Sequence, residues 1–155
     1  MRRHRSGVYR LARAASIVLL ALACSGRSDI ATVRGAASGG VAPALAVERF
    51  LNAVNARDYQ TMGRLFGTRN GSVLDRDPRA EVEERMFALA SILAHQDYAL
   101  EGETPVPGRL GEAVRIMVRL QIGERRALVP FTVVHSRQGA WLVEQIDIEA
   151  VTADF

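Results

Sequence analysis

Residues 43–58, PALAVERFLNAVNARD, contain the pattern that decides the fold. Pro43 suits the first turn of a helix that ends near Ala56. Asp58 can then cap a second helix through its carboxylate. The apolar residues of the first helix recur at i, i+3, i+4 and i+7, which places them on one face: Val47, Phe50, Leu51 and Val54. The stretch therefore predicts two helices that meet at a sharp corner.

Two further helical patterns follow. The second helix ends at Gly67. Its apolar side consists of Tyr59, Met62, Leu65 and Phe66. A third helix begins after the Asp77-Pro78 pair, which supplies a cap and a first-turn proline, and runs to about His95. Its stripe is expected to face the core and consists of Val82, Met86, Leu89 and Leu93.

The remainder of the chain changes to a period of two, which is typical of half-buried antiparallel strands. We expect strands at residues 97–100, 113–122, 127–135 and 140–148, joined by turns at residues 123–125 and 137–139. The alternation in the last strand changes phase, which predicts a bulge near Glu144-Gln145. The chain is thus predicted to be an α+β protein, with three N-terminal helices packed on a curved antiparallel sheet of about four strands.

Residues 1–24 have the layout of an export signal. An arginine-rich start precedes an apolar stretch at residues 14–23, and the only cysteine, Cys24, follows. About ten apolar residues are too few to cross a bilayer core, which needs roughly 20 in helical form. Residues 20–24, LALAC, resemble the lipobox of bacterial lipoproteins, in which the thiol is alkylated by diacylglycerol and becomes the new N-terminus.

The lipobox resemblance implies that Cys24 carries a membrane anchor. Ser25, rather than aspartate, follows it, which under the sorting rule of bacteria with two membranes implies the outer membrane more than the inner one. Two alternatives stay open. Ala21-Leu22-Ala23 also fits an ordinary cleavage site, which would give a periplasmic or secreted soluble protein. A buried structural cysteine is the third reading.

The mature chain divides into three parts. Residues 25–42 are rich in Ser, Gly and Ala and are predicted to be a flexible tether, residues 43–150 the folded domain, and residues 151–155 a C-terminal tail. The formal net charge is +3, but five of the 20 basic residues lie before residue 14. The rest has 15 basic against 17 acidic residues, a charge of about −2. A nucleic-acid partner is therefore not expected.

Helices followed by a curved sheet resemble the nuclear transport factor 2-like superfamily, which includes ketosteroid isomerases and SnoaL-like cyclases. The match is carried by residues 46–58, Leu65-Phe66, Trp141-Leu142-Val143 and Ile146, within residues 43–150. The resemblance implies a cone-like domain. Arg57 stands where the family often has glycine, so the corner must differ or tolerate a strained residue.

The resemblance also implies what chemistry is missing. Phe50 occupies the place of a tyrosine that donates to the substrate oxygen in ketosteroid isomerases. The aspartate base of those enzymes aligns with Leu74, and Asp75 reaches the position only across a gap. Asp77 is better explained as a helix cap. We therefore expect no catalytic residues of this kind and no cofactor.

The superfamily places a pocket behind the first and third helices. The candidate lining is mostly apolar, with two tyrosines at the mouth: Phe50, Val54, Tyr59, Met86, Leu89, Tyr98, Phe131 and Trp141. Such a pocket would bind a small apolar ligand. The alternative is that these side chains simply fill the core.

The densest cluster of polar side chains in the predicted domain includes His95 and Asp97. A histidine near a carboxylate can serve as an acid, a base or a ligand, but His95 also suits a helix end and Asp97 a strand start at the surface. A metal site needs more ligands than this pair, so none is expected. Arg115 and Arg119 share a strand face, which fits an anion site or a solvated face equally.

Two function classes follow from these observations. The first is a non-catalytic envelope lipoprotein whose domain binds a small apolar ligand or an envelope protein, with a homodimer through the sheet as a further option. The second is a cone-fold enzyme, of the isomerase or cyclase kind, with a non-standard site. The two differ in whether acid, base and hydroxyl groups converge in a pocket.

Overall fold

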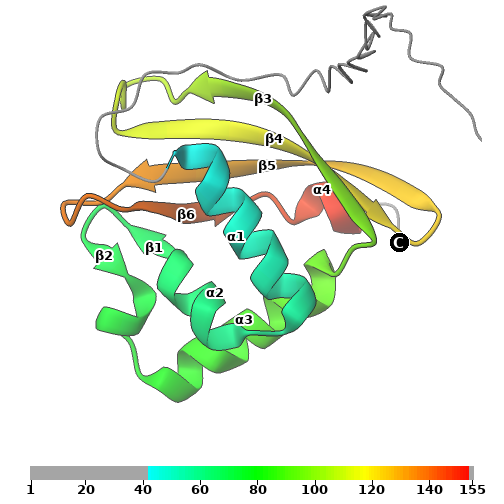
Figure 1. Ribbon diagram of the computed structural model, residues 1–155, viewed down its shortest axis with the longest axis horizontal. Helices are drawn as coiled ribbons and strands as arrows, with labels where there is room; N and C mark the ends of the chain where they lie inside the picture. The colour runs from blue at the N-terminus through cyan, green and yellow to red at the C-terminus, as the bar shows by residue number, and fades with distance from the viewer. Residues whose placement is uncertain (1–41, 154–155) are drawn as a thin grey trace, which may run out of the picture. The chain divides into compact units, whose positions relative to one another are not determined.

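The apolar pattern of residues 43–58 forms the helices that it predicts. The structure, a computed structural model, describes residues 42–153. Within them the chain forms α1 (Pro43–Ala56), α2 (Tyr59–Leu65), α3 (Arg79–Leu93) and a four-stranded sheet. The strands are β3 (Asp97–Pro105), β4 (Ala113–Ile122), β5 (Arg125–His135) and β6 (Trp141–Ile146). Each pairs antiparallel with its neighbour in the order β3-β4-β5-β6, so the α+β class with a four-stranded antiparallel sheet is confirmed (Figure 1).

The core lies between α1–α3 and one face of the sheet. The predicted stripe of α1 is almost fully buried, and Phe50 stands at its centre. Its ring centroid lies 6.1 Å from that of Phe66 and 6.5 Å from that of Phe131 on β5, the latter in an edge-to-face arrangement. Alternate β4 residues complete this face: Ile116, Val118 and Leu120. The period-two pattern therefore identified the core-facing side of β4.

The corner between α1 and α2 depends on one strained residue. Arg57 is the single non-glycine residue in the described range with a positive φ, at φ 53° and ψ 32°. This left-handed conformation lets the Asp58 N–H donate to the Ala53 carbonyl at 2.9 Å. Asp58 then caps α2 as predicted, because its Oδ1 accepts from the Thr61 N–H at 2.9 Å. Hydrogen bonds from the Thr61 side chain and backbone hold the pKa of Asp58 below its usual value.

Both edge strands of the sheet carry a bulge. The β5–β6 register shifts between Thr132 and Val133, which leaves Glu144 as the extra residue and confirms the bulge expected near Glu144-Gln145. A second bulge, which was not expected, lies at Glu101 in β3. Each bulged glutamate forms an ion pair with an arginine, Glu144 with Arg109 at 2.6 Å and Glu101 with Arg119. The bulges are thus built into the polar side of the sheet.

The structure corrects three local predictions. The N-cap of α3 is Pro78, without a side-chain cap, and Asp77 instead accepts from Arg85 at 2.5 Å. β3 extends to Pro105 rather than ending at Leu100. The domain also does not end at residue 150, because α4 (Glu149–Thr152) follows β6 and its Val151 is 5% exposed within the core.

A small hairpin connects α2 to α3, in a stretch for which no strand was predicted. Its strands are β1 (Gly67–Thr68) and β2 (Gly71–Ser72), followed by the one-turn 3-10 helix η1 (Val73–Asp75). Phe66 forms a parallel bridge to Val143, so the chain just before the hairpin lies along the outer edge of β6. Among residues 42–153, β3 is therefore the one strand of this sheet left with an open edge.

Replacing Arg57 with glycine should stabilise the domain. A left-handed conformation costs an L-residue roughly 1–2 kcal/mol, and part of this gain is lost to the larger entropy of glycine in the unfolded chain. We expect Arg57→Gly to raise the free energy of unfolding by about 0.5–1 kcal/mol, measured by urea denaturation. Arg57→Ala keeps the Cβ atom and serves as the control. An equal gain in Arg57→Ala would assign the effect to the lost charge instead of the backbone.

Candidate functional site

Half of the predicted pocket residues form part of the packed core. Phe50, Val54, Met86 and Phe131 are at most 1% exposed and belong to one continuous cluster of buried side chains. Leu89 is partly buried against the same cluster. The Phe50–Phe131 contact crosses the space between α1 and the sheet, where the pocket was expected. The structure therefore brings these residues together as packing partners.

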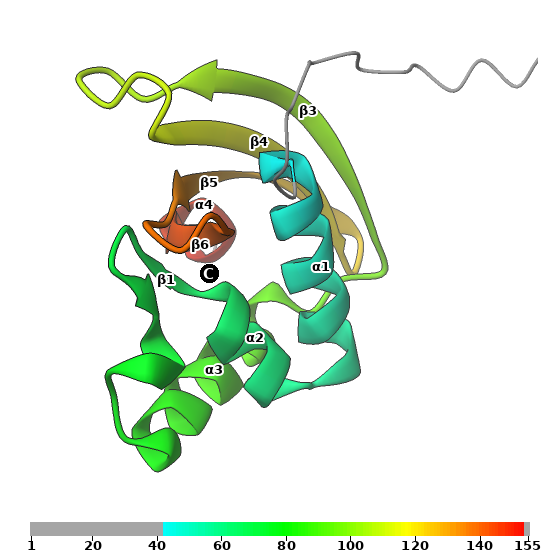
Figure 2. The ribbon, with the colours of Figure 1, turned by 60° about the vertical axis from the view of Figure 1, so that its left-hand side comes forward.

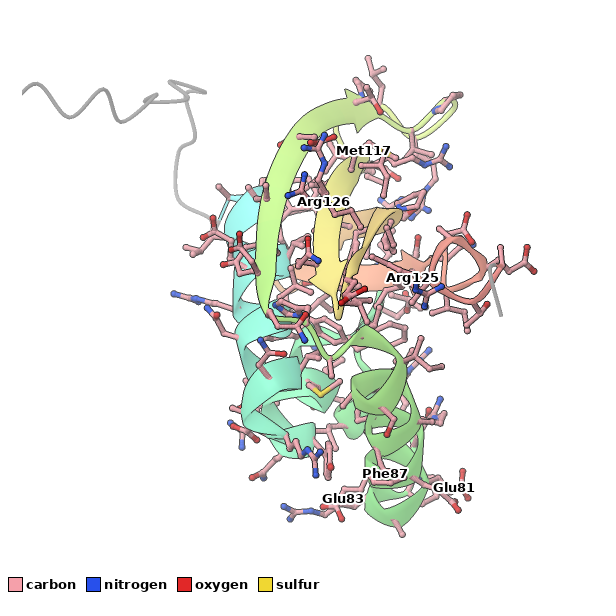
Figure 3. The ribbon with its side chains drawn as sticks, turned by 90° about the vertical axis from the view of Figure 1, so that its right-hand side faces the viewer. Glu81, Glu83, Phe87, Met117, Arg125 and Arg126 are labelled. Carbon is pink, nitrogen blue, oxygen red and sulfur yellow. The ribbon has the colours of Figure 1, made fainter. Side chains whose placement is uncertain are left out.

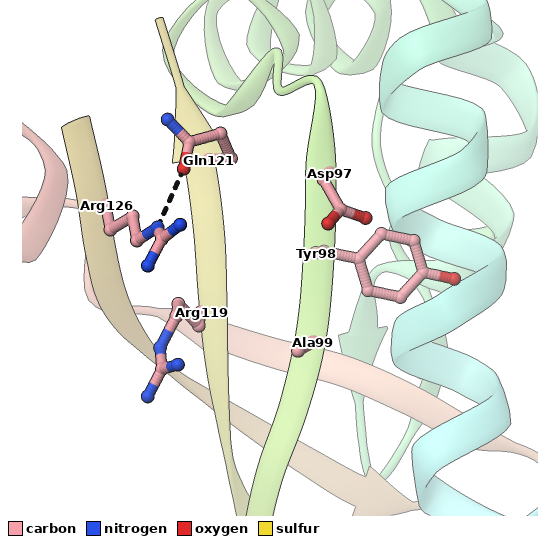
Figure 4. Close-up of a pocket in the computed structure, with 6 residues that line it drawn as sticks. All are labelled: Asp97, Tyr98, Ala99, Arg119, Gln121 and Arg126. Atoms are coloured by element: carbon pink, nitrogen blue, oxygen red, sulfur yellow. Dashed lines mark hydrogen bonds between the residues drawn. The ribbon is translucent and has the colours of Figure 1, made fainter. Parts of the chain in front are cut away.

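The three remaining residues lie at separate places on the rim of the core. Tyr59 meets the exposed ring of Phe87 edge-to-face, at a centroid distance of 5.9 Å. Trp141 contacts His135 at 5.0 Å. Tyr98 points towards α1 (Figure 4) and meets His95 at 5.5 Å. Burial raises the pKa of the Tyr98 hydroxyl, with a smaller contribution from the carboxylates of Glu48 and Asp97, so this hydroxyl stays protonated at neutral pH.

His95 is held by Asn55, the residue that the sequence reasoning missed. The Asn55 carboxamide donates to the His95 carbonyl at 3.0 Å and accepts from the His95 N–H at 3.2 Å. The His95 Nδ1 lies 2.9 Å from the Leu93 carbonyl, which can only accept, so Nδ1 carries the proton. Nε2 then accepts from the Asn55 amide at 3.2 Å. Three hydrogen bonds thus join His95 to the end of α1, and the fourth joins its ring to the last residue of α3.

Asp97 does not join this network. It begins β3 at the surface, one of the two roles expected for it, and lines a cleft together with Arg119 and Arg126. His95 and Asp97 therefore do not form an acid–base pair in the described part of the chain. The position of Asn55 on the polar side of the first helix gave no signal of its role, because only the fold brings it to a residue 40 positions away.

The sheet-face cleft has a volume of about 220 Å³ and is lined by Asp97, Tyr98, Ala99, Arg119, Gln121 and Arg126 (Figure 4). Its two arginines already have acceptors within the protein. Arg126 donates to Gln121 at 3.0 Å, and Arg119 pairs with Glu101. An anion at Arg119, one of the two roles considered for this residue, would therefore have to compete with an internal carboxylate.

Two further features bear on possible chemistry. Among residues 42–153, no three His, Cys, Asp or Glu side chains come close enough to hold a metal ion. In the same range, no helix has the length and hydropathy needed to span a bilayer. Residues 1–24, Cys24 and most of the expected tether lie outside the described residues.

Removing the Asn55 side chain should weaken the domain. Asn55→Ala deletes three hydrogen bonds and leaves the His95 backbone without its partners, at a net of about 0.5–1.5 kcal/mol per bond. We expect the free energy of unfolding to fall by about 2–4 kcal/mol, measured by chemical denaturation. Asn52→Ala, an exposed change one turn earlier in α1, should alter stability by less than about 0.5 kcal/mol. Equal effects at the two positions would argue against the network.

Comparison of the chain with protein-family models, with curated proteins and with solved structures gives no match.

Proposed function

We propose that this protein is an exported, lipid-anchored component of a bacterial cell envelope, whose domain binds a ligand or a protein without catalysis. The observation that carries the proposal is the arrangement of residues 1–24, in which an arginine-rich start and a short apolar stretch lead to LALAC. Cys24 is the lipid attachment site in this proposal. Ser25 favours the outer membrane as the destination, with a soluble periplasmic or secreted form as the alternative.

We further propose that the domain belongs to the nuclear transport factor 2-like superfamily and forms its cone. Three helices, α1 to α3, precede the sheet, and together with one of its faces they enclose the core. The tight corner at Arg57-Asp58 supports the same assignment, because it holds a left-handed residue where the family often has glycine. The shape and connectivity of residues 43–152 support this proposal.

The packing of the core favours binding at the surface of the domain over binding in its interior. A ligand between α1 and the sheet would have to displace Phe50 or Phe131, which contact each other directly. Conversely, the sheet face away from the helices exposes an apolar strip. Leu128 is 46% exposed, Pro130 lies two residues further on the same face, and Met117 pairs with Pro130 across the strands.

A second copy of the chain is the partner that we propose for this sheet face. Arginines surround the strip, namely Arg115, Arg119 and Arg126. Methionine and arginine are enriched in protein interfaces, and an apolar centre with a polar rim is their usual composition. Figure 3 shows Met117 and Arg126 on the sheet, far from the exposed Phe87 with Glu81 and Glu83 on α3. The sheet face is therefore separate from the surface of α3 that carries Phe87, Glu81 and Glu83.

Lipid attachment is tested by replacing the thiol. Cys24→Ala should stop incorporation of labelled fatty acid and leave the precursor with its signal attached, as seen by its mass. Ser25→Asp is the matched variant, since it should keep the label but move the protein to the inner membrane in fractionation. Label in Cys24→Ala, or normal cleavage of that variant to a soluble product, would contradict lipidation.

Pairing through the sheet is tested by adding a like charge to the strip. Leu128→Arg should convert a dimer to a monomer, measured by light scattering across a range of protein concentrations, because two facing arginines repel in an interface. Leu110→Arg makes the same change at an 81% exposed leucine in the β3–β4 loop and should leave the mass unchanged. A monomeric native chain at every concentration would refute the dimer.

A further inference from the structure

Three loops meet at one end of the sheet and enclose a second cleft, which we call the loop cleft. It has a volume of about 310 Å³ and is lined by Arg69, Gly111, Glu112, His135, Ser136, Arg137 and Gly139. These residues come from the β1–β2 turn, the β3–β4 loop, the end of β5 and the β5–β6 connection, and Figure 2 shows the three connections at the same end of the sheet. The cleft is therefore formed by segments that are distant in the sequence.

Hydrogen bonds between the loops fix the shape of the loop cleft. The Arg137 N–H donates to the Arg69 carbonyl at 2.9 Å, and the His135 N–H donates to the Glu112 carbonyl at 2.8 Å. The side chains of Arg69 and Glu112 form an ion pair at 2.7 Å. Each loop is thus bonded to another, so that the cleft exists before any ligand arrives and little ordering cost remains for binding.

The charges in the loop cleft are not balanced. Glu112 neutralises Arg69, but the Arg137 side chain has no ion pair or hydrogen bond among residues 42–153. Ser136 is 2% exposed, and its Oγ accepts from the Ala140 N–H at 3.1 Å, which leaves its own O–H to donate. The His135 ring is the remaining polar group of the lining. This contrasts with the sheet-face cleft, where Arg119 and Arg126 already have acceptors.

We propose that the loop cleft binds the oxyanion of a small ligand, a phosphate or carboxylate group held by Arg137 and Ser136. A guanidinium is planar and donates two parallel hydrogen bonds to such groups. A hydroxyl donor beside it adds a third. The volume suits a small molecule, since ligand sites commonly measure about 300–1,000 Å³. This assignment rests on the binding role proposed above, for which it names the ligand class, and is independent of the lipid anchor.

The fluorescence of Trp141 can report ligand binding in the loop cleft. It is the only tryptophan in the chain, and its ring contacts that of His135, which lines the cleft. The full 155-residue chain in detergent is titrated at constant ionic strength with inorganic phosphate, with acetate, and with micelles containing phosphatidylglycerol. Tryptophan emission and the amide NMR signals of Ser136 and Gly139 are followed together. A response to phosphate or acetate identifies a soluble ligand, whereas a response to phosphatidylglycerol alone identifies a lipid headgroup.

Two matched variants decide the outcome. Arg137→Gln should weaken the apparent affinity about tenfold, the effect of losing one charge-assisted interaction. Arg49→Gln removes the same charge from an exposed position on α1 that lines neither cleft, and it should change the affinity less than about twofold. The proposal is wrong if none of the three additions gives a saturable response. It is also wrong if both variants weaken the affinity equally, because the binding would then depend only on the overall charge of the protein. If the titrations show no binding while Cys24 still incorporates lipid, the proposal of an oxyanion site is wrong but the proposal of a lipid anchor is not affected.

Discussion

The contact between α1 and the sheet is the interaction on which the other elements depend. α1 touches α2, α3, β5 and β6, and its stripe around Phe50 is fully enclosed by them. Burying a phenylalanine or leucine side chain contributes roughly 1.5–3 kcal/mol, so this one helix face accounts for much of the core. The corner at Arg57 and the Asn55 network both start from the end of α1. Arg57 lies between α1 and α2, which pack against each other, and this packing can offset the cost of its left-handed conformation.

The two edges of the sheet are protected in different ways. The chain around Phe66 bridges to Val143 and covers the β6 edge. β3 stays open, but it carries a bulge at Glu101, a second carboxylate at Glu103 and a proline at its end. Like charges and a bulge oppose pairing with another strand, which is how native sheets avoid aggregation by their edges. This protection of the edge is consistent with the proposal that two copies pair across the sheet face.

The sequence predicted the elements well because their signals are local. Periodicity located α1 and the core side of β4, and a change of phase in the last strand located the bulge at Glu144. The failures involve contacts between distant residues. Asp77 is a residue type that often caps helices, but here its carboxylate accepts a hydrogen bond from Arg85, two helical turns later. Leu100 and Pro105 belong to one strand because β4 continues opposite them, which no local pattern of residues 101–105 indicates.

The same reasoning explains why the loop cleft was missed while apolar pocket residues were proposed. In an antiparallel meander, alternate connections lie at the same end of the sheet, so the β3–β4 and β5–β6 loops share an end that the β4–β5 turn does not. This follows from the strand pattern alone and brings Glu112 close to Arg137. Arg69 joins them because the chain around Phe66 runs along β6, which local periodicity does not encode.

Apolar residues at helical spacing predict which side chains are buried. In this domain those side chains pack against one another and do not line a pocket. Polar groups that stay unpaired mark the surface where a partner can bind, and they become visible only when three loops are seen together.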